Sequence, residues 1–309
     1  GQRTGLDADV QREAGSKEPG AVTAVNSGAI VNANPTPSHP DGAAAISLRQ
    51  LSKSFGALQA VRGVSLEVGH GEVFGFLGLN GAGKTTTIRI LLDLLRPTSG
   101  SAAVFGIDCQ KAGLKARALM GYLPGELGLY ADMTGAQVLD LATRLSGGSV
   151  SIDYQRRLVN RLELARADLA RQLREYSSGM KRKLGLVQAL QADPPLLILD
   201  EPTEGLDPLV QRALYEMLFE LRARGRTIFM SSHVLSEVER LCDRIAVIRA
   251  GEIVLVSSVE DARRLSGRTV HVRFAEPVGE VVLPGNMSYI ARNSDSWTLR
   301  VEGEVGALL

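Results

Sequence analysis

Cysteine, long apolar runs and net charge are all scarce in this sequence. The 309 residues include only two cysteines, Cys109 and Cys242, which are too few and too far apart for a disulfide framework or a metal-binding cysteine cluster. No run of about eighteen apolar residues occurs, and no basic segment followed by an apolar one indicates a secretory signal. The formal net charge of +1 lacks the basic excess of nucleic-acid-binding proteins. We therefore expect a chain of a reducing compartment that neither crosses a membrane by itself nor binds nucleic acid.

The first part of the chain differs in composition from the rest. Residues 1–44 contain no aromatic side chain, and the stretch 34–42 holds three prolines, so we expect a disordered N-terminal tail. An ordered domain is expected over residues 45–257. A small C-terminal accessory module is expected over residues 258–309, and its end looks truncated because a helix begins where the chain stops.

A glycine-rich segment carries the strongest motif. It reads Gly78-Leu79-Asn80-Gly81-Ala82-Gly83-Lys84-Thr85-Thr86 and fits G-x-x-x-x-G-K-[ST], a P-loop. A short apolar stretch precedes it and apolar residues at helical spacing follow it, which disfavours a mere glycine turn. The pattern predicts backbone N–H groups around a nucleotide's phosphates. The candidate ATP-binding residues of this segment are Gly78, Asn80, Gly81, Ala82, Gly83, Lys84, Thr85 and Thr86, with the Thr85 hydroxyl also on Mg²⁺.

The pattern of the whole chain favours the α/β class. Strands and helices alternate after the P-loop, which predicts a mostly parallel sheet with helices on both faces. Half-buried strands at 46–51 and 64–68 predict a separate antiparallel β subdomain, and helical spacing over about 126–192 predicts a helical insertion subdomain. Alternating strands at 269–274 and 297–301 predict a β-rich C-terminal module.

Two acidic residues follow a fully apolar strand. Asp200 and Glu201 come directly after Leu196-Leu197-Ile198-Leu199, where a carboxylate beside a P-loop is well placed to hold Mg²⁺. We expect Asp200 to bind the metal and Glu201 to accept a proton from the attacking water. The alternative is an acidic pair that caps the next helix. It is disfavoured because two carboxylates at a buried strand end repel each other without a cation.

Five motifs in order give the chain a family resemblance. They are the Gly78–Thr86 loop, Tyr176-Ser177-Ser178-Gly179-Met180-Lys181, Leu196–Glu201, Glu204-Gly205-Leu206-Asp207 and Ser232-His233. Over residues 46–257 the chain resembles the nucleotide-binding domain of ABC transporters. Met180 and Lys181 in the second motif, together with Tyr122-Leu123-Pro124, resemble the sequences of ATP-binding subunits of ABC-2-type bacterial exporters. These exporters include drug, antibiotic-resistance and sodium-extrusion members.

The resemblance implies roles for residues outside the P-loop. Two copies are expected to face each other head to tail around two ATP molecules, with Ser177, Ser178 and Gly179 of one copy contacting the ATP held by the other. Asp207 would line the seam between the copies, and His233 would contact the γ-phosphate and position water. Without the resemblance, the sequence is equally consistent with His233 as a residue at the start of a helix.

The resemblance also implies that Phe55 stacks on adenine, because the family has an aromatic residue at this position and phenylalanine offers the same π-face. A core phenylalanine beside a turn glycine is the alternative for this residue.

The sequence departs from the family pattern at one position that bears on metal binding. A glutamine usually follows the Tyr-Leu-Pro stretch and contacts Mg²⁺, whereas this chain has Gly125 followed by Glu126. Glycine has no side chain to offer a metal. Glu126 is therefore a candidate Mg²⁺ ligand in its place, if the register shifts by one residue.

Three functions are weighed. The first is an ATP-hydrolysing subunit of an ABC exporter that uses ATP and Mg²⁺, forms a homodimer, and drives a separate transmembrane permease from the cytoplasmic face of the cell membrane. The second is an ABC-type ATPase that acts on ribosomes or DNA; a single domain without sustained heptads or a basic stripe disfavours it. The third is a P-loop small-molecule kinase, which lacks the 176–181 motif. The first is our prediction.

Overall fold

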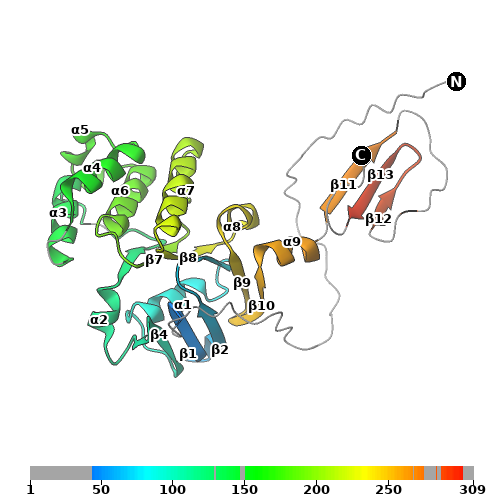
Figure 1. Ribbon diagram of the computed structural model, residues 1–309, viewed down its shortest axis with the longest axis horizontal. Coiled ribbons are helices and arrows are strands. Elements are labelled where there is room, and N and C mark those ends of the chain that lie inside the picture. The colour runs from blue at the N-terminus through cyan, green and yellow to red at the C-terminus, as the bar shows by residue number, and fades with distance from the viewer. Residues whose placement is uncertain are drawn as a thin grey trace. The chain divides into compact units, whose positions relative to one another are not determined.

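The computed structural model describes residues 44–128, 130–146, 150–266, 268–274, 283 and 287–301. Except for Ala44, the tail predicted over residues 1–44 lies outside them. Contacts divide the chain into two units, of which the larger runs from Ile30 to Val259 and the smaller includes Glu260–Leu309. Figure 1 labels the elements of both.

A six-stranded sheet forms the centre of the larger unit. Its order is β10-β9-β3-β8-β7-β6, and every neighbouring pair is parallel except β9 with β10 at the edge. The predicted mostly parallel sheet is therefore confirmed. The strands are β3 (Val73–Leu77), β6 (Met120–Leu123), β7 (Leu196–Asp200), β8 (Thr227–Ser232), β9 (Arg244–Arg249) and β10 (Glu252–Ser258).

The central strand β3 shows how the two faces of this sheet are filled. Phe74 and Phe76 belong to the main core cluster, together with Ile88 of helix α1 (Lys84–Leu91). Gly75 points to the opposite face, where an added Cβ would lie 2.6 Å from Val238 of α8 (Leu235–Leu241). Alternate residues of a strand face opposite sides. Helices therefore cover both faces of β3, and glycine allows the close approach of α8.

An antiparallel sheet lies against the same core. Its order is β2-β1-β4-β5, with β1 (Ile46–Phe55), β2 (Leu58–Val68), β4 (Ser99–Val104) and β5 (Ile107–Asp108). Both β1 and β2 are longer than the sequence pattern indicates, because their outer ends are mostly exposed or half-buried and do not alternate regularly. Helix α2 (Gly113–Arg117) follows β5. Neither β5 nor α2 was predicted, since both are short.

Helices occupy the region between β6 and β7. They are α3 (Gly135–Leu145), α4 (Ile152–Arg161), α5 (Arg166–Leu169), a 3-10 turn at Leu173–Glu175 and α6 (Ser178–Leu190). Figure 1 shows α3 to α6 gathered on one side of the unit, beside α7 (Pro208–Ala223). Helix α6 also contacts β6, and Gly185 permits this approach because an added Cβ would lie 2.9 Å from Leu123. The helical insertion is thereby joined to the central sheet.

The smaller unit holds a three-stranded antiparallel sheet, in the order β11-β13-β12. Its strands are β11 (Arg268–Arg273), β12 (Met287–Arg292) and β13 (Ser296–Val301), and helix α9 (Val259–Ser266) precedes them in the chain. Trp297 and Leu299 form its buried centre. The predicted β-rich module is confirmed, although β12 was not predicted. No helix in the described part of the chain is long and apolar enough to cross a membrane.

Candidate nucleotide-binding site

The glycines of the P-loop occupy places where a side chain does not fit. Gly83 precedes α1 with a φ of 110°, and an added Cβ would lie 2.6 Å from the Ala60 carbonyl oxygen. At Gly78 an added Cβ would lie 2.5 Å from the carbonyl oxygen of Ile248. The loop is thus held between β2 and β9 in a conformation that larger residues cannot adopt.

Lys84 meets a carboxylate inside this loop. Its amine lies 2.5 Å from the Gly78 carbonyl oxygen and 3.2 Å from Oε1 of Glu201, and its side chain is 5% exposed. Oε2 of Glu201 lies 2.9 Å from Nδ1 of His233, which is exposed. The three side chains come from α1, the end of β7 and the end of β8. The structure therefore brings the expected general base, histidine and P-loop lysine into one cluster.

Asp200 forms a second contact between β7 and the P-loop. Its carboxylate is fully buried and accepts a hydrogen bond of 2.9 Å from the Thr85 hydroxyl. The Ser231 hydroxyl donates to the other oxygen of Asp200 and accepts a bond of 3.1 Å from the N–H of Glu201. Sequence reasoning missed Ser231. What brings Ser231 to this site is the parallel register of β7 and β8, which places it opposite Asp200.

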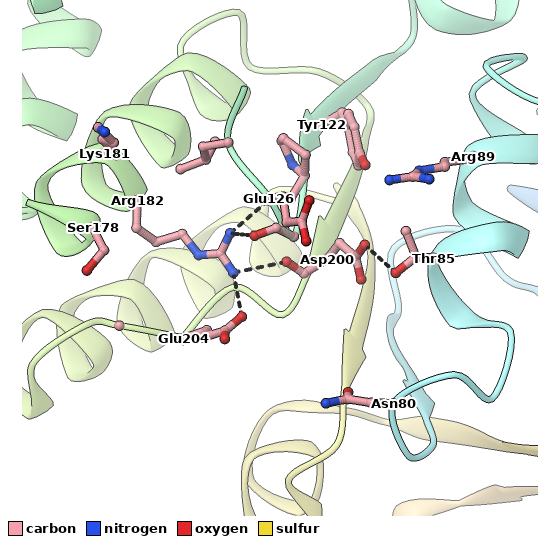
Figure 2. A pocket seen from close by; sticks show the side chains of 14 residues that line it. Asn80, Thr85, Arg89, Tyr122, Glu126, Ser178, Lys181, Arg182, Asp200 and Glu204 are labelled. Carbon is pink, nitrogen blue, oxygen red and sulfur yellow. Dashed lines mark hydrogen bonds and ion pairs between the residues drawn. The ribbon is translucent and has the colours of Figure 1, made fainter. Parts of the chain in front are cut away.

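An open pocket of about 660 Å³ borders Asp200 (Figure 2). Burial, and then the charge of Asp200, raise the pKa of Tyr122 at its wall to about 12, so this phenol stays neutral. The lining residues are Asn80, Thr85, Arg89, Tyr122, Pro124, Gly125, Glu126, Leu127, Ser178, Lys181, Arg182, Asp200, Glu204 and Gly205. Residues of the P-loop, of the strand ends and of the 176–181 motif thus share one cavity.

Both residues after the Tyr-Leu-Pro stretch, Gly125 and Glu126, line this pocket. A Cβ added to Gly125 would lie 3.2 Å from Oδ2 of Asp200, so a side chain at this position would reach the carboxylate. Glu126 lines the same pocket but is exposed (Figure 2). Among the residues that the structure describes, no three His, Cys, Asp or Glu side chains are grouped as a metal site.

The oxygens of Thr85 and Asp200 nevertheless suit Mg²⁺. This ion takes one or two protein oxygens, completes its shell with phosphate and water, and does not need a cage of carboxylates. A pair of protein ligands beside a phosphate-binding loop is therefore sufficient.

The 176–181 motif and Asp207 lie at helix starts. The Ser177 hydroxyl accepts a hydrogen bond of 3.2 Å from the N–H of Met180 and caps α6, whose first two turns include Ser178 and Gly179. Asp207 caps α7 by accepting from the N–H of Val210, which is the main cause of its lowered pKa. Ser177 and Asp207 are both exposed and are therefore open to a partner.

Phe55 lies at the end of β1. Its ring is 49% exposed, which excludes the core phenylalanine that was the alternative interpretation. The amine of Lys53 lies 5.0 Å from the ring centroid. An exposed aromatic ring with a nearby cation can receive a base that carries phosphates.

Comparison with known proteins now decides the family. The family model described as ABC transporter matches residues 61–204. A Nod factor export ATP-binding protein of Paraburkholderia xenovorans is 41% identical over 67% of this chain and 69% of its own length. The chain belongs to the ABC transporter ATP-binding proteins. A bacitracin transport ATP-binding protein of Bacillus licheniformis is 34% identical, over 77% of this chain and 78% of the relative.

Other relatives support the same assignment. An ABC transporter ATP-binding protein of a Nostoc strain is 42% identical, and the match spans 64% of that relative's length. A solved structure of the ATP-binding subunit of an ABC transporter is 32% identical, with a TM-score of 0.66 over 72% of this chain and 92% of that chain. A dimeric ATP-binding cassette with ADP and phosphate shares the fold, at 21% identity and a TM-score of 0.63. The α/β class with a P-loop core is thereby confirmed.

Proposed function

We propose that this ABC transporter ATP-binding protein hydrolyses ATP to ADP and phosphate and so drives a membrane exporter. The observation that supports this best is the contact of Glu201 with both Lys84 and His233, beside the contact of Thr85 with Asp200. Phosphoryl transfer needs positioned charges more than covalent chemistry, and these five side chains supply them. We assign the nucleotide-binding domain to residues 45–257, with its helical subdomain at about 126–192.

In the proposed site, residues of the P-loop and of its neighbours have separate roles in binding ATP and Mg²⁺. The N–H groups from Gly78 to Thr86 surround the phosphates, and Lys84 contacts the β- and γ-phosphates. Thr85 and Asp200 hold Mg²⁺, which offsets phosphate charge and orients the ATP. Phe55 stacks on the adenine. Gly125 has no side chain to bind Mg²⁺, and Glu126 is the candidate to supply that ligand in its place.

Glu201 is the proposed general base. One of its oxygens contacts His233 and the other contacts Lys84, so a phosphate must replace Glu201 as the partner of Lys84 when ATP enters. The released carboxylate then accepts a proton from the attacking water, while His233 positions that water at the γ-phosphate. The sequence of contacts couples nucleotide entry to the freeing of the base.

The proposed assembly is a head-to-tail homodimer on a permease. At the start of α6, the exposed Ser177 hydroxyl and the N–H of Gly179, with Ser178 between them, would contact the γ-phosphate of the partner's ATP. The names of two relatives refer to export of Nod factor and transport of bacitracin, which favours an exporter over a ribosome or DNA factor. We place the subunit at the cytoplasmic face of the membrane, bound to a separate transmembrane permease.

Phosphate release from ATP by the purified chain tests the activity. Glu201→Gln is expected to retain ATP binding and to lower turnover by about 10²–10⁴-fold, the range for loss of a general base. Lys84→Ala is expected to weaken ATP binding itself. Glu216→Gln is the matched control, because Glu216 is an exposed acid on α7 that pairs with Arg212 on the same helix. Near-normal turnover of Glu201→Gln removes Glu201 from the base role.

Two further measurements test the assembly. Ser177→Arg is expected to abolish ATP-driven dimerisation measured by light scattering in the Glu201→Gln background, because a long cation occupies the γ-phosphate contact. A dimer that persists in this variant contradicts the head-to-tail arrangement. Affinity purification from membranes is expected to recover a multispan permease; recovery of ribosomes or DNA instead supports the alternative function.

A further inference from the structure

Arg182 is a buried arginine that lies between the ends of two strands. It sits in the second turn of α6, and its side chain is only 4% exposed. Its guanidinium donates to the carbonyl oxygens of Pro124 at 2.7 Å and Gly125 at 3.0 Å, just after β6. It also donates to the carbonyl oxygens of Asp200, at 3.2 Å, and Glu201, at the end of β7. Figure 2 shows the contact of Arg182 with Asp200 beside the pocket.

The guanidinium of Arg182 joins the two chain segments beyond the last paired residues of β6 and β7. Strands β6 and β7 pair in parallel up to Leu123 opposite Leu199. Beyond that pair, backbone carbonyls of the two chain segments are joined through Arg182. A planar fork with five N–H donors can bridge four carbonyls in this way, whereas a lysine amine has three donors at one point. The contact therefore depends on the shape of the guanidinium and not on its charge alone.

Glu201 needs such support because its backbone is strained. Its φ is 51°, in the left-handed region that residues with a side chain seldom adopt. The Ser231 hydroxyl holds the Glu201 N–H, and Arg182 holds the Glu201 carbonyl. Both sides of this residue are thus fixed by side chains from other elements. That conformation directs its carboxylate to Lys84 and His233.

Burying this cation has a desolvation cost that packing alone does not require. Burial lowers the pKa of Arg182, and the carboxylates of Glu204, Asp200 and Glu201 oppose that shift. Glu204 is the nearest acid, at 3.8 Å, and is exposed. A buried apolar side chain would fill the space without this desolvation penalty.

We propose that Arg182 is a positioning residue for ATP hydrolysis. It holds the backbone of Glu201 in place and links it to the start of α6. Ser177, Ser178 and Gly179 lie one turn before Arg182 on the same helix, so a shift of this helix on partner binding moves the Glu201 carbonyl. The same shift moves Pro124 and Gly125 at the edge of the pocket. This inference rests on the proposed ATPase function, and it identifies a link between the dimer surface and the general base.

Arg182→Lys tests the link, since it keeps the charge and loses the fork. Turnover is expected to fall at least about tenfold, because a small misplacement of a reacting group lowers rate steeply. The Kd for ATP is expected to stay within about threefold, since Arg182 contacts no P-loop residue that we place on the phosphates. Hydrogen exchange is expected to rise in peptides covering 120–128 and 196–206. Arg212→Lys, on the exposed face of α7, is the matched control.

The outcomes separate three conclusions. If the wild type and Arg212→Lys hydrolyse ATP and Arg182→Lys matches them within about twofold, the positioning role is wrong while the ATPase function stands. If turnover and ATP affinity fall together, Arg182 serves the binding site and the proposal is also overturned. Arg182→Gln replaces the lysine variant if that does not fold, and failure of both to fold assigns Arg182 a purely structural role. Absence of hydrolysis by the wild type overturns the ATPase function itself.

Discussion

Loss of the Glu201 charge is expected to destabilise the nucleotide-free subunit. Lys84 is buried, and its amine lies 3.2 Å from Oε1 of Glu201. At that distance and an effective dielectric constant of about 20, the attraction between unit charges is about 5 kcal/mol. Desolvation offsets much of it. A net loss of about 1–3 kcal/mol therefore remains for Glu201→Gln, because the buried amine loses its charged partner.

The effect on ATP binding is expected to have the opposite sign. In the wild type a phosphate has to displace Glu201 from Lys84 and then lies close to the freed carboxylate. Neither cost applies to Glu201→Gln. A non-hydrolysable ATP analogue should therefore bind this variant more tightly, about tenfold for each 1.4 kcal/mol of lost competition.

Thermal unfolding, with and without the analogue, measures both effects. About 1–3 kcal/mol corresponds to a fall in Tm of about 2–10 °C for a domain of this size. The analogue should then raise the Tm of Glu201→Gln by more than that of the wild type, with Glu216→Gln as the control. A nucleotide-free variant that melts at or above the wild type refutes the reasoning, because it shows that repulsion between Asp200 and Glu201 outweighs the attraction of Lys84.

Three other outcomes are expected. Phe55→Ala should raise the Kd for ATP about tenfold and Phe55→Tyr should leave it unchanged, because stacking on a base is worth about 1–3 kcal/mol; an unchanged Kd for the alanine variant removes the adenine contact. Burial raises the pKa of the Cys109 thiol to about 12 and also raises the pKa of Cys242, so a maleimide at pH 8 should label the native chain far more slowly than the unfolded chain. Fast native labelling would contradict this. Gly106→Ala should lower the free energy of unfolding by about 1–2 kcal/mol through backbone strain alone, because its φ is 75° and no atom lies within 4 Å of an added Cβ. Gly100→Ala should cost about 1–3 kcal/mol more, because its Cβ would lie 2.2 Å from a backbone oxygen; equal denaturation midpoints would contradict this.

Much of the fold follows from local pattern. The buried run 196–199 indicates a central strand, and the structure has β7 there with every residue buried. The helices α6 and α7 begin directly after Ser177 and Asp207, whose side chains cap them, as residues of these two types commonly do. Strand β12 escaped prediction because its residues are nearly all exposed and give no alternation. Short or solvent-exposed elements depend on neighbouring strands, which a local window does not contain.

The sequence by itself determined the residue types that phosphate chemistry requires. Gly78 to Thr86, Asp200 and Glu201 stand in motifs whose spacing is set by backbone geometry, so their proximity to a nucleotide could be inferred before any fold was known. What the motif does not contain is the partner of each side chain. The spacing of the motifs does not indicate that Lys84 forms an ion pair with Glu201 in the nucleotide-free chain.

Only the tertiary structure decided the contacts that hold these groups. Ser231 reaches Asp200 because β7 and β8 run in parallel register, and Arg182 reaches four carbonyls because α6 packs on the ends of β6 and β7. Serine and arginine are common surface residues, and neither has a sequence signature for this role. Their function arises from a parallel sheet, which gathers strand ends that lie far apart in the chain at one edge.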